Sequence, residues 1–151
     1  MITEQKDANL ISELNTLVEI NNDRVEGYKT ALKETEDADL KELFKNMAHD
    51  SFGFKNELAD EIMKLGGEPT QSTCTSGKVY RAWMDIRAAL SNKDRKAILS
   101  SCEFGEDAAL ETYEKVLKSI ESPAAFGLIS KQKTVLQADH DKIKALRDSA
   151  K

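Results

Sequence analysis

Apolar residues recur every three or four positions in four long stretches of the chain, which is the spacing that gathers them on one face of an α-helix. The pattern predicts long helices over about residues 7–34, 38–65, 91–120 and from residue 122 to near the end. A shorter amphipathic stretch predicts a fifth helix over residues 78–90. The remaining long segment, GGEPTQSTCTSG, has loop chemistry throughout.

Helix boundaries are marked by residues with known capping roles. Gly66 and Gly67 predict a left-handed stop after the second helix. Ser91 with Asp94 resembles a capping box that opens the third long helix, with Asp in place of the usual Glu. Ser122 predicts the N-cap of the last helix, because a proline follows it at the first helical position.

The lengths of the connections predict how these helices are arranged. Tight turns make each hairpin antiparallel, and a crossover of about 25 residues lets the third long helix run parallel to the second, as in one-crossover ferritin-like bundles. We therefore expect an all-α fold: a ferritin-like four-helix bundle with a long crossover containing a short extra helix between helices 2 and 3. One domain should span residues 1–151.

The amino-acid composition favours helices and argues against some classes of binding partner. Charged residues make up 32% of the chain and aromatic residues only 6%, which favours helix over sheet. The net charge is −5 and the basic residues are dispersed, so nucleic acid is not an expected partner. No apolar run approaches the roughly 20 residues that span a bilayer, so no membrane segment is expected. The first ten residues lack the apolar core of a signal peptide, and we expect a cytoplasmic protein.

The two cysteines do not indicate a disulfide framework or a zinc site. Cys74 falls in the polar loop and Cys102 on a predicted core face, so two free thiols are expected. No other nucleophile arrangement or phosphate-binding loop is recognisable, and we predict no catalytic and no cofactor-binding residues.

Polar residues interrupt the apolar stripe of each long helix. Burial of such groups costs a few kcal/mol each unless they are paired. The predicted buried network consists of Asn21, Tyr28, Ser51, Glu106, Gln132 and His140. His49 falls on the opposite side of its helix, and Glu26 and Glu103 lie off the stripe, so these three are expected in solvent.

Glu106 and His140 allow two interpretations. Ferritin-like di-iron sites use one Glu from each of two helices and Glu-x-x-His from each of the other two. Here the motif-like pairs are Asn46-x-x-His49 and Gln137-x-x-His140, and both lack the carboxylate. Glu106 therefore either pairs with His140, Asn21, Tyr28 or Arg95, or joins His140 in holding one divalent metal.

Several segments in order resemble a known family. They are LNTLVEINNDRVEGYKTA, ELADEIMKLGGEP, the crossover with Trp83, FGEDAALETYEKVL and LQADHDKIKALR. They resemble the bacterial four-helix-bundle proteins called domain of unknown function 2383, placed among ferritin-like proteins. The resemblance implies the ferritin-like topology and brings no established activity.

The ferritin-like pattern also assigns six ligand positions, and most of them have changed here. The resemblance places these positions at Asn21, Ser51, Phe54, Glu106, Gln137 and His140. At most two of the six remain metal ligands, which indicates a degenerate di-iron site.

Three functional hypotheses remain. The first is a non-catalytic bundle with a binding or structural role, including a stress-related one. The second is a metal-binding or oxidoreductase-like bundle that uses the reduced Glu106 and His140 site. The third is a partner-recognition module built on Tyr80 and Trp83, which requires Trp83 to be substantially exposed. Long helices would also suit a homodimer, and the sequence identifies no protein partner.

Overall fold

Five α-helices form the structure, a computed structural model that describes residues 2–75 and 77–150, with side chains described from residue 7 onward. The helices are α1 (Ile2–Glu34), α2 (Ala38–Lys64), α3 (Gly77–Asn92), α4 (Arg95–Ser119) and α5 (Pro123–Ser149). No strand occurs among these described residues. The all-α prediction is confirmed, and α1 begins five residues earlier than predicted.

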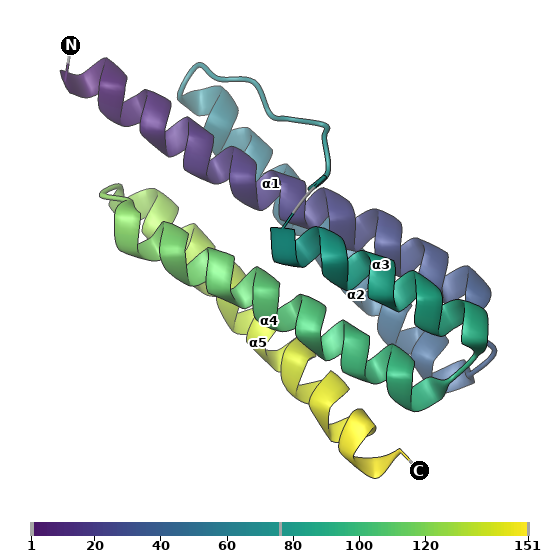
Figure 1. Cartoon of the computed structure of the whole chain (residues 1–151). Helices are drawn as coiled ribbons and strands as arrows, with labels where there is room; N and C mark the ends of the chain where they lie inside the picture. The colour runs from purple at the N-terminus through teal and green to yellow at the C-terminus, as the bar shows by residue number, and fades with distance from the viewer. Residues whose placement is uncertain (1, 76, 151) are drawn as a thin grey trace.

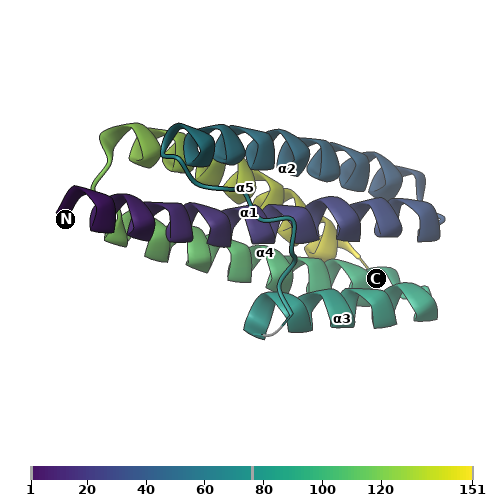
Figure 2. The ribbon, with the colours of Figure 1, turned by 90° about the horizontal axis from the view of Figure 1, so that it is seen from above.

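The four long helices pack as two antiparallel hairpins, α1 with α2 and α4 with α5. Figure 1 shows that α4 runs in the same direction as α2, as the length of the crossover predicted. The short helix α3 lies against α4 and α1, on the side of the molecule away from α2 (Figure 2). No described helix combines the length and the apolar character that would let it cross a membrane.

The helix caps confirm two of the three sequence assignments. Gly66 has a positive φ of 84° after α2, and the Gly67 N–H donates to the Ile62 carbonyl at 3.0 Å. Ser122 caps α5, because its hydroxyl accepts a hydrogen bond from the Ala125 N–H at 3.2 Å.

The capping box predicted at Ser91 is wrong. Ser91 lies inside α3 and donates its hydroxyl to the Arg87 carbonyl at 3.2 Å. Asp94 is the N-cap of α4 and accepts from the Ala97 N–H at 3.1 Å. Helix α3 continues past its last buried residue, Leu90, through exposed Ser91 to Asn92, and the chain turns only at Lys93, whose φ is 54°.

The crossover loop is held on α1 by polar side chains. The side chains that bond to loop backbone are Asn15, Asn22 and Asp23. Asn22 donates to the Ser72 carbonyl at 2.9 Å, and Asp23 accepts from the Cys74 N–H at 3.0 Å. These bonds place the loop along α1 and deliver the chain to the start of α3.

The apolar core consists of two clusters that follow one another along the bundle. The first includes Leu14, Leu17, Leu58, Ala109, Tyr113, Ile129 and Leu136. The second includes Tyr28, Phe44, Met47, Ile86, Leu99, Cys102 and Ile143. Each fully buried Leu, Ile or Phe stabilises the fold by about 1.5–3 kcal/mol. Each long helix passes from one cluster to the other, and polar residues lie between them.

Close helix contacts depend on residues without bulky side chains. Trp83 of α3 is partly buried and packs edge-on against Tyr28, with ring centroids 5.0 Å apart. A Cβ added at Gly27 would overlap the Trp83 ring. A Cβ at Gly105 would lie 3.4 Å from the Cβ of Ala82, so α4 and α3 approach each other closely at this glycine.

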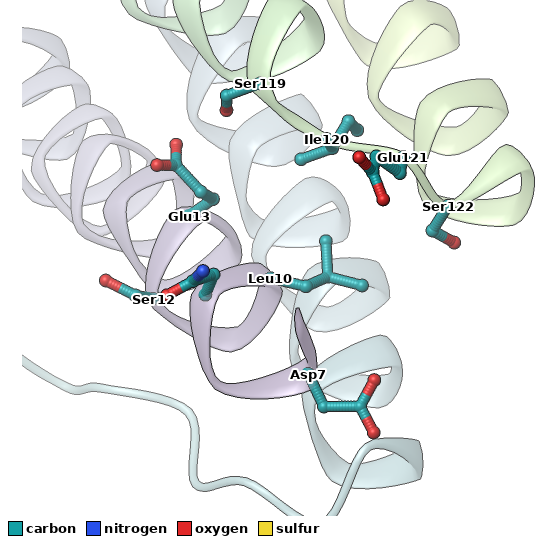
Figure 3. Close-up of a pocket in the computed structure, with 9 residues that line it drawn as sticks. Asp7, Leu10, Ser12, Glu13, Ser119, Ile120, Glu121 and Ser122 are labelled. Atoms are coloured by element: carbon teal, nitrogen blue, oxygen red, sulfur yellow. The ribbon is translucent and has the colours of Figure 1, made fainter. Parts of the chain in front are cut away.

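The two hairpins separate near the start of α1. A pocket of about 720 Å³ opens there between α1 and the turn that joins α4 to α5. Figure 3 shows Leu10 of α1 facing this turn, where Ile120 and Glu121 lie. Asp7 and Glu13 also line the pocket, and none of the predicted network residues does.

Gly27 and Gly53 make a matched pair of helical glycines. Gly27→Ala should destabilise the protein by about 1–3 kcal/mol, because the added methyl group displaces Trp83. Gly53→Ala should stabilise it by about 1 kcal/mol, because Gly53 has open space around it and alanine favours helix. Urea unfolding of both variants measures the two effects. A neutral or stabilising Gly27→Ala would contradict the tight packing of α3 on α1.

Candidate functional site

A polar layer lies between the two apolar clusters, and each of the four long helices contributes to it. The residues at its centre are Arg24 from α1, Ser51 from α2, Glu106 from α4 and Asp139 from α5. All four are buried, and Glu106 is only 1% exposed. The layer therefore holds ionised side chains away from water.

Arg24 is the cation at the centre of this layer. Its Nη2 lies 2.7 Å from Glu106 Oε1 and 3.4 Å from Asp139 Oδ2. Its Nη1 donates to the hydroxyl oxygen of Ser51. Burial by itself lowers the pKa of Arg24, but the Glu106 carboxylate and its other partners raise it above the ordinary value. Arg24 therefore stays charged and neutralises the buried carboxylate.

Tyr28 supplies a second donor to Glu106. The Tyr28 hydroxyl donates to Glu106 Oε1 at 2.6 Å, so one carboxylate oxygen receives both Tyr28 and Arg24. Burial, followed by the charge of Glu106, raises the pKa of Tyr28 well above its usual value, which keeps the hydroxyl protonated. The other oxygen, Glu106 Oε2, has no hydrogen-bond partner among the described protein atoms.

Asn21 begins a second branch of the network. Its amide nitrogen donates to the Tyr113 hydroxyl at 2.8 Å, and Tyr113 donates to Gln132 Oε1 at 2.8 Å. Gln132 in turn donates to the Phe54 carbonyl and to Glu57. This branch links α1, α4, α5 and α2 on the side of the first apolar cluster.

The structure buries five of the six side chains predicted to form the network: Asn21, Tyr28, Ser51, Glu106 and Gln132. It separates the sixth, His140, from Glu106, and no hydrogen bond or ion pair joins the two in the described part of the chain. The predicted pairing is therefore not formed. Asp139, one residue earlier on α5, occupies the inward position instead.

His140 lies at the outer seam between α4 and α5. Its Nε2 is 2.8 Å from Asp107 Oδ1 and 3.8 Å from Glu103 Oε1. Its Nδ1 is 3.1 Å from Asp141 Oδ1. Glu103 was expected in solvent, but its side chain is only 13% exposed and contacts both His140 and the guanidinium of Arg147.

His49, Glu26 and Arg95 lie away from the polar layer. His49 and Glu26 are exposed, as predicted. Arg95 is not a partner of Glu106, because it forms ion pairs with Asp37 and Asp39 at the start of α2. The charge partners that sequence reasoning missed are Arg24 and Asp139.

The two cysteines are free thiols, as predicted. Burial raises the pKa of the Cys74 thiol to about 12, and the hydrogen bond with Asp23 raises it as well. Burial also raises the pKa of Cys102, followed by the charge of Glu106. Both sulfurs therefore remain protonated and are poor nucleophiles.

The crossover helix forms one wall of a groove of about 260 Å³ against α1 and the crossover loop. Tyr80, Trp83 and Arg87 line it from α3. Trp83 is only partly exposed and packs on Tyr28, so its ring has a structural role in fixing α3.

Comparison with protein families identifies the chain as a member of one of them. Residues 9–119 match the family described as Domain of unknown function (DUF2383), and the chain belongs to this family. A comparison with curated proteins gave no match. The family match covers Arg24, Ser51 and Glu106 and ends before α5, which carries Asp139 and His140.

Glu106→Gln should destabilise the protein by about 3–5 kcal/mol, because it leaves the buried Arg24 without its carboxylate. Glu114→Gln is the matched control, since Glu114 lies on the same helix and forms an exposed ion pair with Lys133. The control should change stability by no more than about 0.5 kcal/mol. Urea unfolding at neutral pH provides both values, and equal effects would contradict the central role of the Arg24–Glu106 pair.

Asp139 should make stability depend on pH. Burial raises its pKa from 3.8 to about 6, although Arg24 acts in the opposite direction. Between these values the folded protein binds more protons than the unfolded chain, so ionisation of Asp139 lowers stability as pH rises through this window.

Asp139→Asn removes this titration. The free energy of unfolding of the variant minus that of the wild type should increase as pH rises from 3.8 to about 6 and then level off. Urea unfolding across this range measures the difference. A difference that decreases over the same range would show that Arg24 outweighs burial at Asp139.

Proposed function

We propose that this protein is a non-catalytic ferritin-like four-helix bundle that acts through binding or as a structural component, including in a stress response. The observation that carries the proposal is the position of Arg24, whose guanidinium lies in the polar layer and binds Glu106 directly. An arginine cation here supplies the positive charge that a metal would supply in a ferritin-like di-iron protein.

The residues at the expected ligand positions do not fit a di-iron centre. Glu106 offers one oxygen to Arg24 and Tyr28, which leaves only Oε2. The amide of Asn21 is used by Tyr113, and its Oδ1 is the only other buried side-chain atom without a partner among the described residues. Two oxygen ligands are too few to hold iron. The positive charge of the Arg24 guanidinium beside them also repels a metal cation.

The reduced Glu106 and His140 site is the competing proposal. A single metal bound by both residues requires them to face one position, but they have separate sets of partners. Glu106 binds Arg24 and Tyr28, whereas His140 contacts carboxylates at the outer seam. The contacts therefore favour the non-catalytic proposal over an oxidoreductase-like one.

Metal content and iron oxidation test the proposal. Wild-type protein and Glu106→Gln, both purified without chelator, should contain equal amounts of iron and manganese, since the core offers no site. Addition of the wild-type protein should not accelerate the oxidation of Fe²⁺ by oxygen beyond the rate in buffer. Elemental analysis and absorbance kinetics provide the two readouts.

Stoichiometric iron that is lost in Glu106→Gln would overturn the proposal. Asp107→Asn is the control for metal held outside the core, because Asp107 lies at the α4–α5 seam and is 59% exposed. Metal that is lost in Asp107→Asn but kept in Glu106→Gln would leave the proposal for the core intact.

A further inference from the structure

We infer that Glu103, Asp107 and His140 form a binding site for a divalent transition-metal ion at the seam between α4 and α5. Each residue offers one ligand atom, and these atoms lie within 4.8 Å of one another. The inference is independent of the proposed function, because it uses none of the residues of the buried layer.

The backbone places these ligands together. Glu103 and Asp107 are four residues apart on α4, so their side chains project from adjacent turns of one helix face. His140 reaches them from α5. A tetrahedral ion with bonds of about 2.0–2.2 Å separates its ligand atoms by roughly 3.3–3.6 Å. The observed separations of 2.8 Å and 3.8 Å from His140 Nε2 lie on either side of that range.

The orientation of His140 points to a cation at Nε2. Both ring nitrogens face carboxylates, since Nδ1 lies 3.1 Å from Asp141 Oδ1 and Nε2 lies 2.8 Å from Asp107 Oδ1. In the tautomer with its hydrogen on Nδ1, the ring donates to Asp141 and presents the Nε2 lone pair to the carboxylate of Asp107, so a metal ion can bind between Nε2 and Asp107 Oδ1. Metal-binding histidines commonly donate their second N–H to a carboxylate in this way.

Asp141 is itself held in place for this role. Gln137, one turn earlier on α5, donates to Asp141 Oδ1 at 3.1 Å. The same Oδ1 lies 3.1 Å from His140 Nδ1, so one carboxylate oxygen contacts both side chains. The imidazole therefore has a fixed orientation that presents Nε2 to the α4 carboxylates.

Arg147 is the competing cation at the site. Its Nη1 contacts Glu103 Oε2, whereas Glu103 Oε1 faces His140. A metal ion could use Oε1 while Arg147 keeps Oε2. The guanidinium charge nearby still weakens the binding of a second cation.

The ligand types indicate which ions bind. Imidazole suits zinc, copper, iron and nickel, whereas magnesium prefers oxygen ligands and retains its water. One imidazole with two carboxylates and positions left for water fits Zn²⁺ or Co²⁺. Asp107 is largely exposed, so an ion can enter from solvent.

Zinc titration followed by NMR tests the inference, since the chain has only two histidines. Zn²⁺ should shift the imidazole signals of His140 and leave those of His49 unchanged, because His49 lies exposed on α2. His49→Gln and His140→Gln assign the signals. Mg²⁺ at the same concentration should shift neither histidine. Shifts at His49 alone, at both histidines or at neither would overturn the inference.

Calorimetric titration with Zn²⁺ measures the contribution of each ligand. Asp107→Asn and His140→Gln should each weaken binding by about tenfold or more, and His49→Gln should have no effect. Arg147→Gln should strengthen binding severalfold, because it removes the competing cation. If His140→Gln affects folding, Asp107→Asn still tests the site, because it changes an exposed side chain.

The two proposals fail in different ways. Unchanged Zn²⁺ affinity in both Asp107→Asn and His140→Gln would overturn the seam site and leave the core proposal standing. Zn²⁺ binding that is abolished in folded Glu106→Gln and kept in Asp107→Asn would place the ion in the core, and both proposals would then be wrong.

Discussion

The buried ion pair between Arg24 and Glu106 is the interaction on which the centre of this bundle depends. An arginine does not lose its charge under ordinary conditions, so a carboxylate must remain opposite it wherever it is buried. Each long helix supplies a partner within the same layer: Arg24, Ser51, Glu106 and Asp139. A shift of one helix by a turn, about 5.4 Å, would strand these groups in an apolar core. We interpret the layer as fixing the register of the four helices.

Helical periodicity predicted most of the residues in this layer but did not identify Arg24, which supplies its positive charge. Asn21 and Tyr28 lie on the apolar stripe of α1, and both are buried. Arg24 lies three residues after Asn21 and four before Tyr28, so at 100° per residue it falls about 60° and 40° from them. The helical angle of Arg24 therefore already indicates a position on the buried side of α1. Its burial depends on Glu106, which is 82 residues away in the chain, and no local pattern shows that pairing.

The assignment of His140 to the core failed for a geometric reason. On α5, Asp139 and His140 lie at similar angles on either side of Leu136 and Ile143, so these two apolar residues do not decide between them. Buried Gln132 lies about 20° from Asp139, whereas buried Ile129 lies about 20° from His140, so periodicity alone does not choose between the two. The rotation of α5 about its axis is set by packing against the other helices, which sequence periodicity locates only to within about one residue.

Because His140 faces the seam and not the core, α4 and α5 each carry polar residues in two separate places, one at the buried guanidinium of Arg24 and one at the α4–α5 surface. Glu106 and Asp139 face inward to a permanent guanidinium, whereas Glu103 and His140 face the seam, where Arg147 is the neighbouring cation. The cation in the core is a side chain of the protein, so it cannot exchange with ions in the solvent. At the seam, two carboxylates and an imidazole present ligand atoms to a surface that an ion can reach. An exchangeable cation there would join α4 to α5 beside the contacts that hold both helices to α1.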